Sequence, residues 1–140
     1  MYLKIFTDGA SWGNPGPAAI GVLIKDEKGT ELAKVSRHIG NATNNQAEYQ
    51  AAIVALEIAK NFKADKITLH LDSELIARQL NRRYKVRSSK LLPLYKKASK
   101  LSSELANLSI INIKNTENNE AHALAKAALK KAVKNKAIQG

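Results

Sequence analysis

The 140-residue chain contains no cysteine, which excludes disulfide bonds and thiolate metal ligands. Aromatic residues make up only 5% of it, against 44% hydrophobic residues in all, so we expect a core of mainly aliphatic side chains. No run of about 18 apolar residues occurs, which argues against a transmembrane helix and a membrane partner. Residues 1–8 lack a basic region followed by a long apolar stretch, so we expect no signal peptide and a cytoplasmic location.

Acidic residues are scarce in the second half of the chain. Residues 1–70 carry 8 Lys and Arg against 7 Asp and Glu, whereas residues 71–140 carry 15 against 5. The net charge of +11 therefore comes almost entirely from the second half. This asymmetry indicates a polyanionic partner such as nucleic acid, with a lysine-rich solvated surface as the alternative.

The order of apolar and turn-forming segments indicates an α/β fold. Alternation of apolar residues predicts strands at about residues 2–7, 19–25, 30–38, 67–71 and 108–113. Helical spacing predicts helices at about residues 43–62, 73–80, 91–105 and 119–134. Hairpins come first and strands separated by helices follow, which predicts a five-stranded mixed sheet, three strands antiparallel and then two parallel, with helices on both faces. We expect one domain over residues 1–140, with about 135–140 as a frayed basic tail.

Three acidic residues lie at the ends of these predicted elements. Asp8 follows the first strand, Asp72 follows the fourth, and Glu48 lies in the predicted first turn of the first helix. Carboxylates are depleted from strands and are seldom buried without a partner. One explanation is that the three converge on a divalent cation. Taken singly, Asp8 could be a turn residue, Asp72 a residue that precedes or caps a helix, and Glu48 a carboxylate favoured by the helix dipole.

Four short motifs and the last helix together match a known family. The matching segments are Thr7-Asp8-Gly9-Ala10-Ser11, Asn14-Pro15-Gly16-Pro17, Thr43-Asn44-Asn45-Gln46-Ala47-Glu48, Leu71-Asp72-Ser73, and Asn118, Ala121, Leu124 and Ala125 in the last helix. In this order and spacing they resemble type 1 ribonuclease H, over nearly the whole chain. The chain is most similar to the compact prokaryotic members, which lack an additional basic protrusion.

The resemblance implies an endonuclease that hydrolyses the RNA strand of RNA–DNA hybrids and leaves 5′-phosphate and 3′-hydroxyl ends. It implies two divalent ions, Mg²⁺ or Mn²⁺, and we expect the full pair to assemble only with substrate bound. By this resemblance Asp8 bridges the two ions and Asp72 completes the metal set. Glu48 holds the ion nearer the attacking water and lies near the 2′-hydroxyl of the cut nucleotide.

The chain departs from the family at the fourth acidic position. The family pattern has Asp in the last helix, where this chain has His122. A neutral imidazole can bind a metal or its water, and it suits Mn²⁺ better than Mg²⁺. His122 could also carry a proton near the leaving group, or face solvent without a metal role. Glu117 or Glu120 could supply a carboxylate instead, although Glu120 lies on a different helix face from His122.

The resemblance also nominates residues that contact nucleic acid. Polar or small residues beside Asp8 and Glu48 are candidates for the RNA minor groove: Gly9, Ala10, Ser11, Asn14, Asn45 and Gln46. Thr43 and Asn44, at a helix N-terminus, resemble the DNA-phosphate pocket and also suit helix capping. The densest basic segment is a candidate for the DNA strand, with a solvated loop as the alternative: Arg82, Arg83, Lys85, Arg87 and Lys90. Trp12 could pack under its loop or touch the minor groove.

Two other functions compete with this interpretation. A non-catalytic module that binds hybrid or double-stranded RNA would explain the loss of the fourth acid. The three carboxylates argue against it, because a protein that only binds phosphate gains nothing from them. The second competing function is a resolvase- or integrase-like nuclease. The segments at 14–17 and 43–45 argue against it. Double-stranded RNA remains open as an additional substrate, and a monomer is the default expectation.

Overall fold

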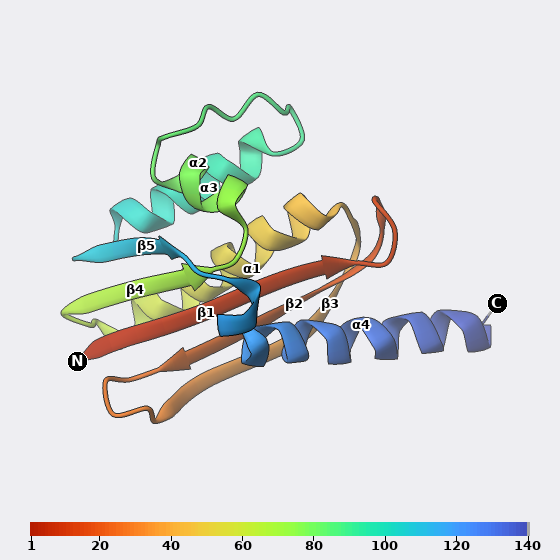
Figure 1. The fold of residues 1–140 in the computed structure, drawn as a ribbon, viewed down its shortest axis with the longest axis horizontal. Coiled ribbons are helices and arrows are strands. Elements are labelled where there is room, and N and C mark those ends of the chain that lie inside the picture. The colour runs from red at the N-terminus through yellow and green to blue at the C-terminus, as the bar shows by residue number, and fades with distance from the viewer. Residues whose placement is uncertain (140) are drawn as a thin grey trace.

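The computed structural model of the chain, described here for residues 1–139 and for side chains 1–134, contains a five-stranded mixed sheet in the order β3-β2-β1-β4-β5. The strands are β1 (Tyr2–Ser11), β2 (Gly16–Lys25), β3 (Glu31–Ala42), β4 (Lys66–Leu71) and β5 (Leu108–Asn112). The first three pair antiparallel, and β4 and β5 extend the sheet in parallel (Figure 1). The predicted fold class is therefore confirmed.

Helices cover both faces of this sheet, as expected. They are α1 (Asn44–Ala59), which continues as a 3₁₀ turn (Lys60–Phe62), α2 (Glu74–Leu80), α3 (Leu92–Ser103) and α4 (Asn119–Gln139). A second 3₁₀ turn (Asn115–Glu117) precedes α4. Helix α1 packs on β1 and β2 and is covered in turn by α3, whereas α4 packs on β1, β2 and β3 (Figure 1). The main hydrophobic core lies on the α1 face and is mostly aliphatic, with Tyr49 as its largest buried side chain.

Local signals in the sequence set the helix starts. Thr43 caps α1 through a capping box: its hydroxyl accepts from the Gln46 amide at 3.1 Å, and the Gln46 side chain accepts from the Thr43 amide at 2.8 Å. Ser73 caps α2 by accepting from the Ile76 amide. Pro93 lies in the first turn of α3, where its missing N–H leaves no hydrogen bond unmade.

Three predicted boundaries are wrong. The segment from Gly9 to Ser11 is not a loop, because β1 continues through Ser11, which pairs with Ala18. For the same reason β3 extends to Ala42, which pairs with Gly16. Helix α4 continues to Gln139 rather than ending near 134, so most of the expected frayed tail is helical, and residue 140 lies outside the described residues.

Helix α4 approaches the sheet closely because β2 carries Gly21. A Cβ atom at Gly21 would lie 2.1 Å from the Ala121 carbonyl oxygen and 2.7 Å from the Ala125 nitrogen. This contact fixes the start of α4 over β1 and β2, where the candidate site lies. No helix among residues 1–139 is long and apolar enough to cross a membrane.

Candidate active site

The parallel pairing of β1 with β4 brings Asp8 and Asp72 together. Thr7 and Leu71 are register partners, and Asp8 and Asp72 are the next residue on each strand. Beyond this point β4 ends, while β1 continues against β2, so Asp8 lies within a strand and not at its end. Because β4 no longer pairs with β1 beyond Leu71, Asp8 lies beside the point where Asp72 leaves the sheet. Asp8 is 5% exposed and Asp72 is half-buried.

Helix α1 brings Glu48 to the same point. Glu48 is the fifth residue of α1, one position beyond the predicted first turn, and is only 8% exposed. Its Oε1 accepts a hydrogen bond of 2.7 Å from the backbone N–H of Gly9 on β1. A Cβ atom at Gly9 would lie 2.3 Å from the Ala47 carbonyl carbon and 2.5 Å from the Glu48 nitrogen. Glycine at this position therefore allows α1 to press directly on β1.

The three carboxylates form one cluster. Each of Asp8, Glu48 and Asp72 offers an oxygen within 4.8 Å of the others. Burial raises the pKa of Glu48 well above its ordinary value, and contact with the negatively charged Asp8 raises it further. Burial and the charge of Asp8 also raise the pKa of Asp72. This mutual repulsion is the electrostatic signature of a site that a cation would stabilise, and the all-oxygen donor set suits Mg²⁺ or Mn²⁺.

Asn118 links the carboxylate cluster to the start of α4. The sequence identified this residue only as part of the family motif. Its side chain is 1% exposed, and its Nδ2 donates to the Thr7 carbonyl at 2.8 Å and to Asp72 Oδ2 at 3.4 Å. The donation to Asp72 favours the charged carboxylate and lowers its pKa, against the effect of burial. The amide thereby holds the ends of β1 and β4 in register at the cluster.

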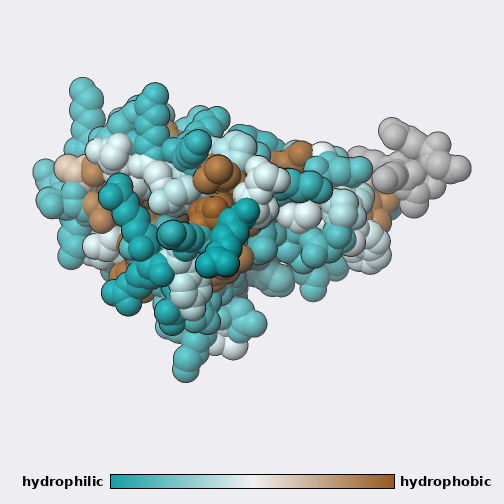
Figure 2. All heavy atoms as spheres, turned by 90° about the horizontal axis from the view of Figure 1, so that it is seen from above, coloured by the Kyte–Doolittle hydropathy of each residue, from teal (hydrophilic) through white to brown (hydrophobic). Residues whose placement is uncertain are grey.

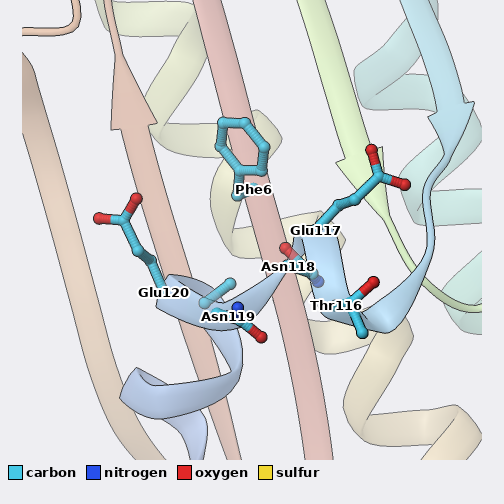
Figure 3. A pocket seen from close by; sticks show the side chains of 7 residues that line it. Phe6, Thr116, Glu117, Asn118, Asn119 and Glu120 are labelled. Atoms are coloured by element: carbon cyan, nitrogen blue, oxygen red, sulfur yellow. The ribbon is translucent and has the colours of Figure 1, made fainter.

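His122 lies beside the cluster, on the first turns of α4. Its Nδ1 is 2.9 Å from Asp8 Oδ2, and its side chain is 57% exposed. His122 therefore lies within hydrogen-bonding distance of one of the three carboxylates while more than half of its side chain is exposed, and its metal role stays a prediction. The proposed substitutes bond elsewhere: Glu120 pairs with Lys25 at 2.9 Å, and Glu117 accepts from the Lys114 amide at 3.2 Å. In Figure 3 their side chains point in different directions around the start of α4.

A groove joins the start of α1 to part of the basic segment. It has a volume of about 640 Å³, and its lining includes the predicted contact residues Asn14, Thr43, Asn44, Asn45, Lys85, Arg87 and Lys90. The Asn44 amide donates to Asn14 Oδ1 at 3.1 Å, which holds the β1–β2 loop against the helix N-terminus. Hydrophilic side chains cover most of the face seen from above, where the 81–91 loop lies (Figures 1 and 2). Three exposed cations, Lys85, Arg87 and Lys90, therefore share this groove with the N-terminal end of a helix, an arrangement that suits phosphate.

Other predicted contact residues do not join this groove. Arg82 and Arg83 wrap around the end of α2, where the Arg83 amide donates to the Arg78 carbonyl, and Arg82 lines a different cavity beside α3. The Ser11 hydroxyl is within 2.7 Å of the Ala42 carbonyl, and its amide donates to Asn44 Oδ1. These local contacts give the three residues structural roles, and the nucleic-acid role of each stays a prediction.

The remaining aromatic and histidine residues have local roles. His70 stacks on Phe6 with ring centroids 4.4 Å apart, and its Nδ1 is 3.0 Å from the Ile5 carbonyl oxygen. Phe6 in turn lines a cavity of about 330 Å³ beside the start of α4 (Figure 3). His38 is exposed on β3. Trp12 is 65% exposed at the tip of the β1–β2 loop, so it does not pack beneath that loop.

Comparison with known proteins gives one consistent family. A family model described as reverse transcriptase-like matches residues 6–128. Ribonuclease HI of Halobacterium salinarum is 41% identical over 124 residues, which are 89% of this chain and 62% of that protein. The chain thus spans less than two thirds of the length of this curated relative.

Solved structures agree over nearly the full chain. The crystal structure of RNase H1 from Halobacterium salinarum has 39% identity and a TM-score of 0.89, covering 94% of this chain and 99% of that one. LC11-RNase H1, isolated from compost, was crystallised in complex with an RNA/DNA hybrid. That structure has 41% identity and a TM-score of 0.87, and covers 94% of this chain and 99% of the other.

Proposed function

Since this chain belongs to the ribonuclease H family, we propose that it hydrolyses the RNA strand of RNA–DNA hybrids by two-metal-ion catalysis and leaves 5′-phosphate and 3′-hydroxyl ends. The observation that carries the proposal is the cluster of Asp8, Glu48 and Asp72, whose oxygens lie within 4.8 Å of one another. The complex of LC11-RNase H1 with a hybrid supports the choice of substrate.

The donor set of this cluster fits divalent cations. Two of its carboxylates have raised pKa values because negative charge is concentrated in a buried place, and bound cations would relieve that repulsion. Asp8, Glu48 and Asp72 would hold Mg²⁺ or Mn²⁺, and the ions would activate water and stabilise the leaving oxygen. The rest of the site acts by holding these carboxylates in place.

Each residue has a distinct task in this proposal. Asp8 would hold both ions, and Asp72, which accepts a hydrogen bond from Asn118, would complete the metal set. Glu48, held by the hydrogen bond from the Gly9 amide, would hold the ion nearer the attacking water and lie near the 2′-hydroxyl of the cut nucleotide. His122, 2.9 Å from Asp8, takes the place of the fourth acid as a ligand or proton carrier near the leaving group.

The groove at the start of α1 would hold the DNA strand. The N-terminal end of α1 at Thr43 and Asn44 favours phosphate through the helix dipole, and Lys85, Arg87 and Lys90 provide positive charge. The RNA strand then lies over the carboxylate cluster, with Asn14, Asn45 and the β1–β2 loop between the two strands. In this arrangement Gly9 and Ser11 shape the site rather than read the RNA.

Cleavage of a labelled hybrid tests this function directly. Wild-type protein with Mg²⁺ or Mn²⁺ should cut only the RNA strand, and Asp72→Asn should abolish cutting. Products with 3′-phosphate ends, or equal rates for wild type and Asp72→Asn, would contradict the proposal. Binding of hybrid without cleavage in either metal would favour the non-catalytic alternative.

The same assay with double-stranded RNA decides whether double-stranded RNA is a second substrate. The monomeric state stays a prediction.

A further inference from the structure

Helix α4 carries a row of exposed basic residues that begins at the active site. His122, Lys126, Lys130 and Lys134 are spaced four residues apart and are all exposed. At 1.5 Å of rise per residue, neighbours in this row lie about 6 Å apart along the helix axis. This is close to the straight-line distance between successive phosphates of one nucleic-acid strand.

The packing of α4 determines which way this row faces. Ala121, Ala125 and Leu129 are buried and turn toward the sheet. On one flank of that buried row, the Leu124 carbonyl accepts from Ser36 of β3 at 2.6 Å, which turns this flank toward the edge strand. His122 and Lys126 lie on the other flank, and Lys130 and Lys134 turn progressively toward solvent, because residues four apart differ by about 40° around the helix. The row therefore starts against Asp8 and winds onto the solvent-facing side of α4.

The charge of this row is not neutralised by the protein. No acidic residue follows Glu120 in the sequence. Among the side chains described up to residue 134, Lys126, Lys130 and Lys134 form no ion pair. A row of unpaired cations that extends from the catalytic cluster is complementary to a phosphate backbone. A surface that only solvates the helix would not need to lie in line with the active site.

We propose that Lys126, Lys130 and Lys134 bind successive phosphates of the RNA strand beyond the cut phosphate. This rests on the proposed function, which sets the cut RNA phosphate beside Asp8 and His122. The groove at the start of α1 is reserved for the DNA strand, so the strand that continues along α4 is the RNA. The row thus extends the substrate-binding surface away from the groove at 43–45 and 85–90.

Neighbouring lysines on α4 supply a matched comparison. Lys131 follows Lys130 directly but lies on another side of the helix, where it lines a cavity with Arg37 and His38 of β3. Lys130→Gln should raise the KM for hybrid several-fold with kcat unchanged, whereas Lys131→Gln should leave both near the wild-type values. Equal effects of the two substitutions would contradict the proposal.

The salt dependence measures the number of contacts. Replacing Lys126, Lys130 and Lys134 together by Gln should reduce the slope of log affinity against log salt by about 2–3, since each phosphate contact adds about 0.7–0.9. The control replaces Lys28, Lys100 and Lys131 by Gln and removes the same charge from other surfaces. An equal reduction of the slope in both triple variants would show that only general electrostatic attraction acts, and would contradict specific phosphate binding by the α4 row.

Neutral phosphates identify the strand. In a series of hybrids, one phosphate of the RNA strand at a time is replaced by a neutral methylphosphonate on a 2′-O-methyl nucleotide. Replacements beyond the cut should weaken binding to the wild-type protein. At one of these positions the replacement should weaken binding to wild type but not to Lys130→Gln. The same pattern on the DNA strand instead would overturn the strand assignment. If wild type does not cut an unmodified hybrid, the proposed function fails. If it cuts but Lys130→Gln behaves as Lys131→Gln does, the α4 row alone fails.

Discussion

The backbone N–H of Gly9 donates a 2.7 Å hydrogen bond to the Glu48 carboxylate across the contact between β1 and α1. The absence of a side chain at Gly9 is what allows this contact, because a Cβ there would meet the α1 backbone at 2.3–2.5 Å. One residue thus combines helix packing with the orientation of a proposed metal ligand. Four predictions follow from this and related contacts.

Gly9→Ala should both destabilise the protein and weaken cation binding. The new methyl group would force α1 away from β1, at a cost of about 1–3 kcal/mol or more. It would also displace Glu48 from the cluster. Thermal unfolding and Mn²⁺ titration of the variant measure the two effects. Gly29→Ala is the control, because its Cβ would meet nothing within 4 Å. The positive φ of Gly29 makes this substitution destabilising too, but Mn²⁺ affinity should stay unchanged.

The metal-free protein should lose stability as pH rises above about 4.5, through the titration of Glu48. In the unfolded chain Glu48 has its ordinary pKa of 4.5, whereas burial raises the pKa in the folded chain. Between these values the folded state retains a proton that the unfolded state has released, so raising the pH favours unfolding by up to about 1.4 kcal/mol per unit.

Glu48→Gln isolates this effect from other titrating groups. The lowered pKa of half-buried His70 acts in the opposite direction, because the unfolded chain binds a proton that the folded chain has released, so the fold gains stability as pH rises toward 6.5. Urea unfolding of wild type and Glu48→Gln in EDTA, at pH 4 to 8, should show that the variant is relatively more stable at the higher pH. A constant difference across this range would contradict the raised pKa of Glu48.

Asp72→Asn should abolish cleavage while keeping the fold. Removal of a carboxylate from a crowded, partly buried cluster relieves repulsion with Asp8, so the variant should unfold at or above the wild-type temperature without metal. Activity should fall about a thousandfold or more, since several kcal/mol of metal stabilisation is lost. Calorimetry and single-turnover cleavage test the pair of effects, and a destabilised variant would mean that Asp72 mainly supports the fold.

His122→Asp should shift the metal preference toward Mg²⁺. Imidazole is a better ligand for Mn²⁺ than for Mg²⁺, and a carboxylate suits Mg²⁺. The initial rate of cleavage in each metal gives the ratio for wild type and variant. His38→Asp, on the exposed surface of β3, is the matched control. An unchanged ratio for His122→Asp would show that the imidazole does not select the metal.

Much of the fold could be predicted because its determinants are local. Alternating apolar residues identified each strand, and Thr43 and Ser73 marked helix starts by capping. The continuation of β1 through Ser11 could not be predicted, because it depends on pairing with β2, and Asp8 and Gly9 have low strand propensity. Context outweighed propensity at these positions.

The site was predicted less completely than the fold. The sequence indicated the three carboxylates, and their convergence depends on the register of Thr7 with Leu71, which only the folded sheet provides. The close approach at Gly9 also requires the position of α1. The basic segment divides because the chain turns at Arg82, whose φ is 62°, and directs Arg82 and Arg83 away from the groove that Lys85 lines.

Anomalous scattering from crystals grown with Mn²⁺ and an uncleavable hybrid tests the central claim most directly. We predict two Mn²⁺ peaks among Asp8, Glu48 and Asp72, with the RNA backbone over them. Peaks elsewhere, or hybrid bound with no ion among these three carboxylates, would contradict the proposed cation site and the hydrolysis that depends on it.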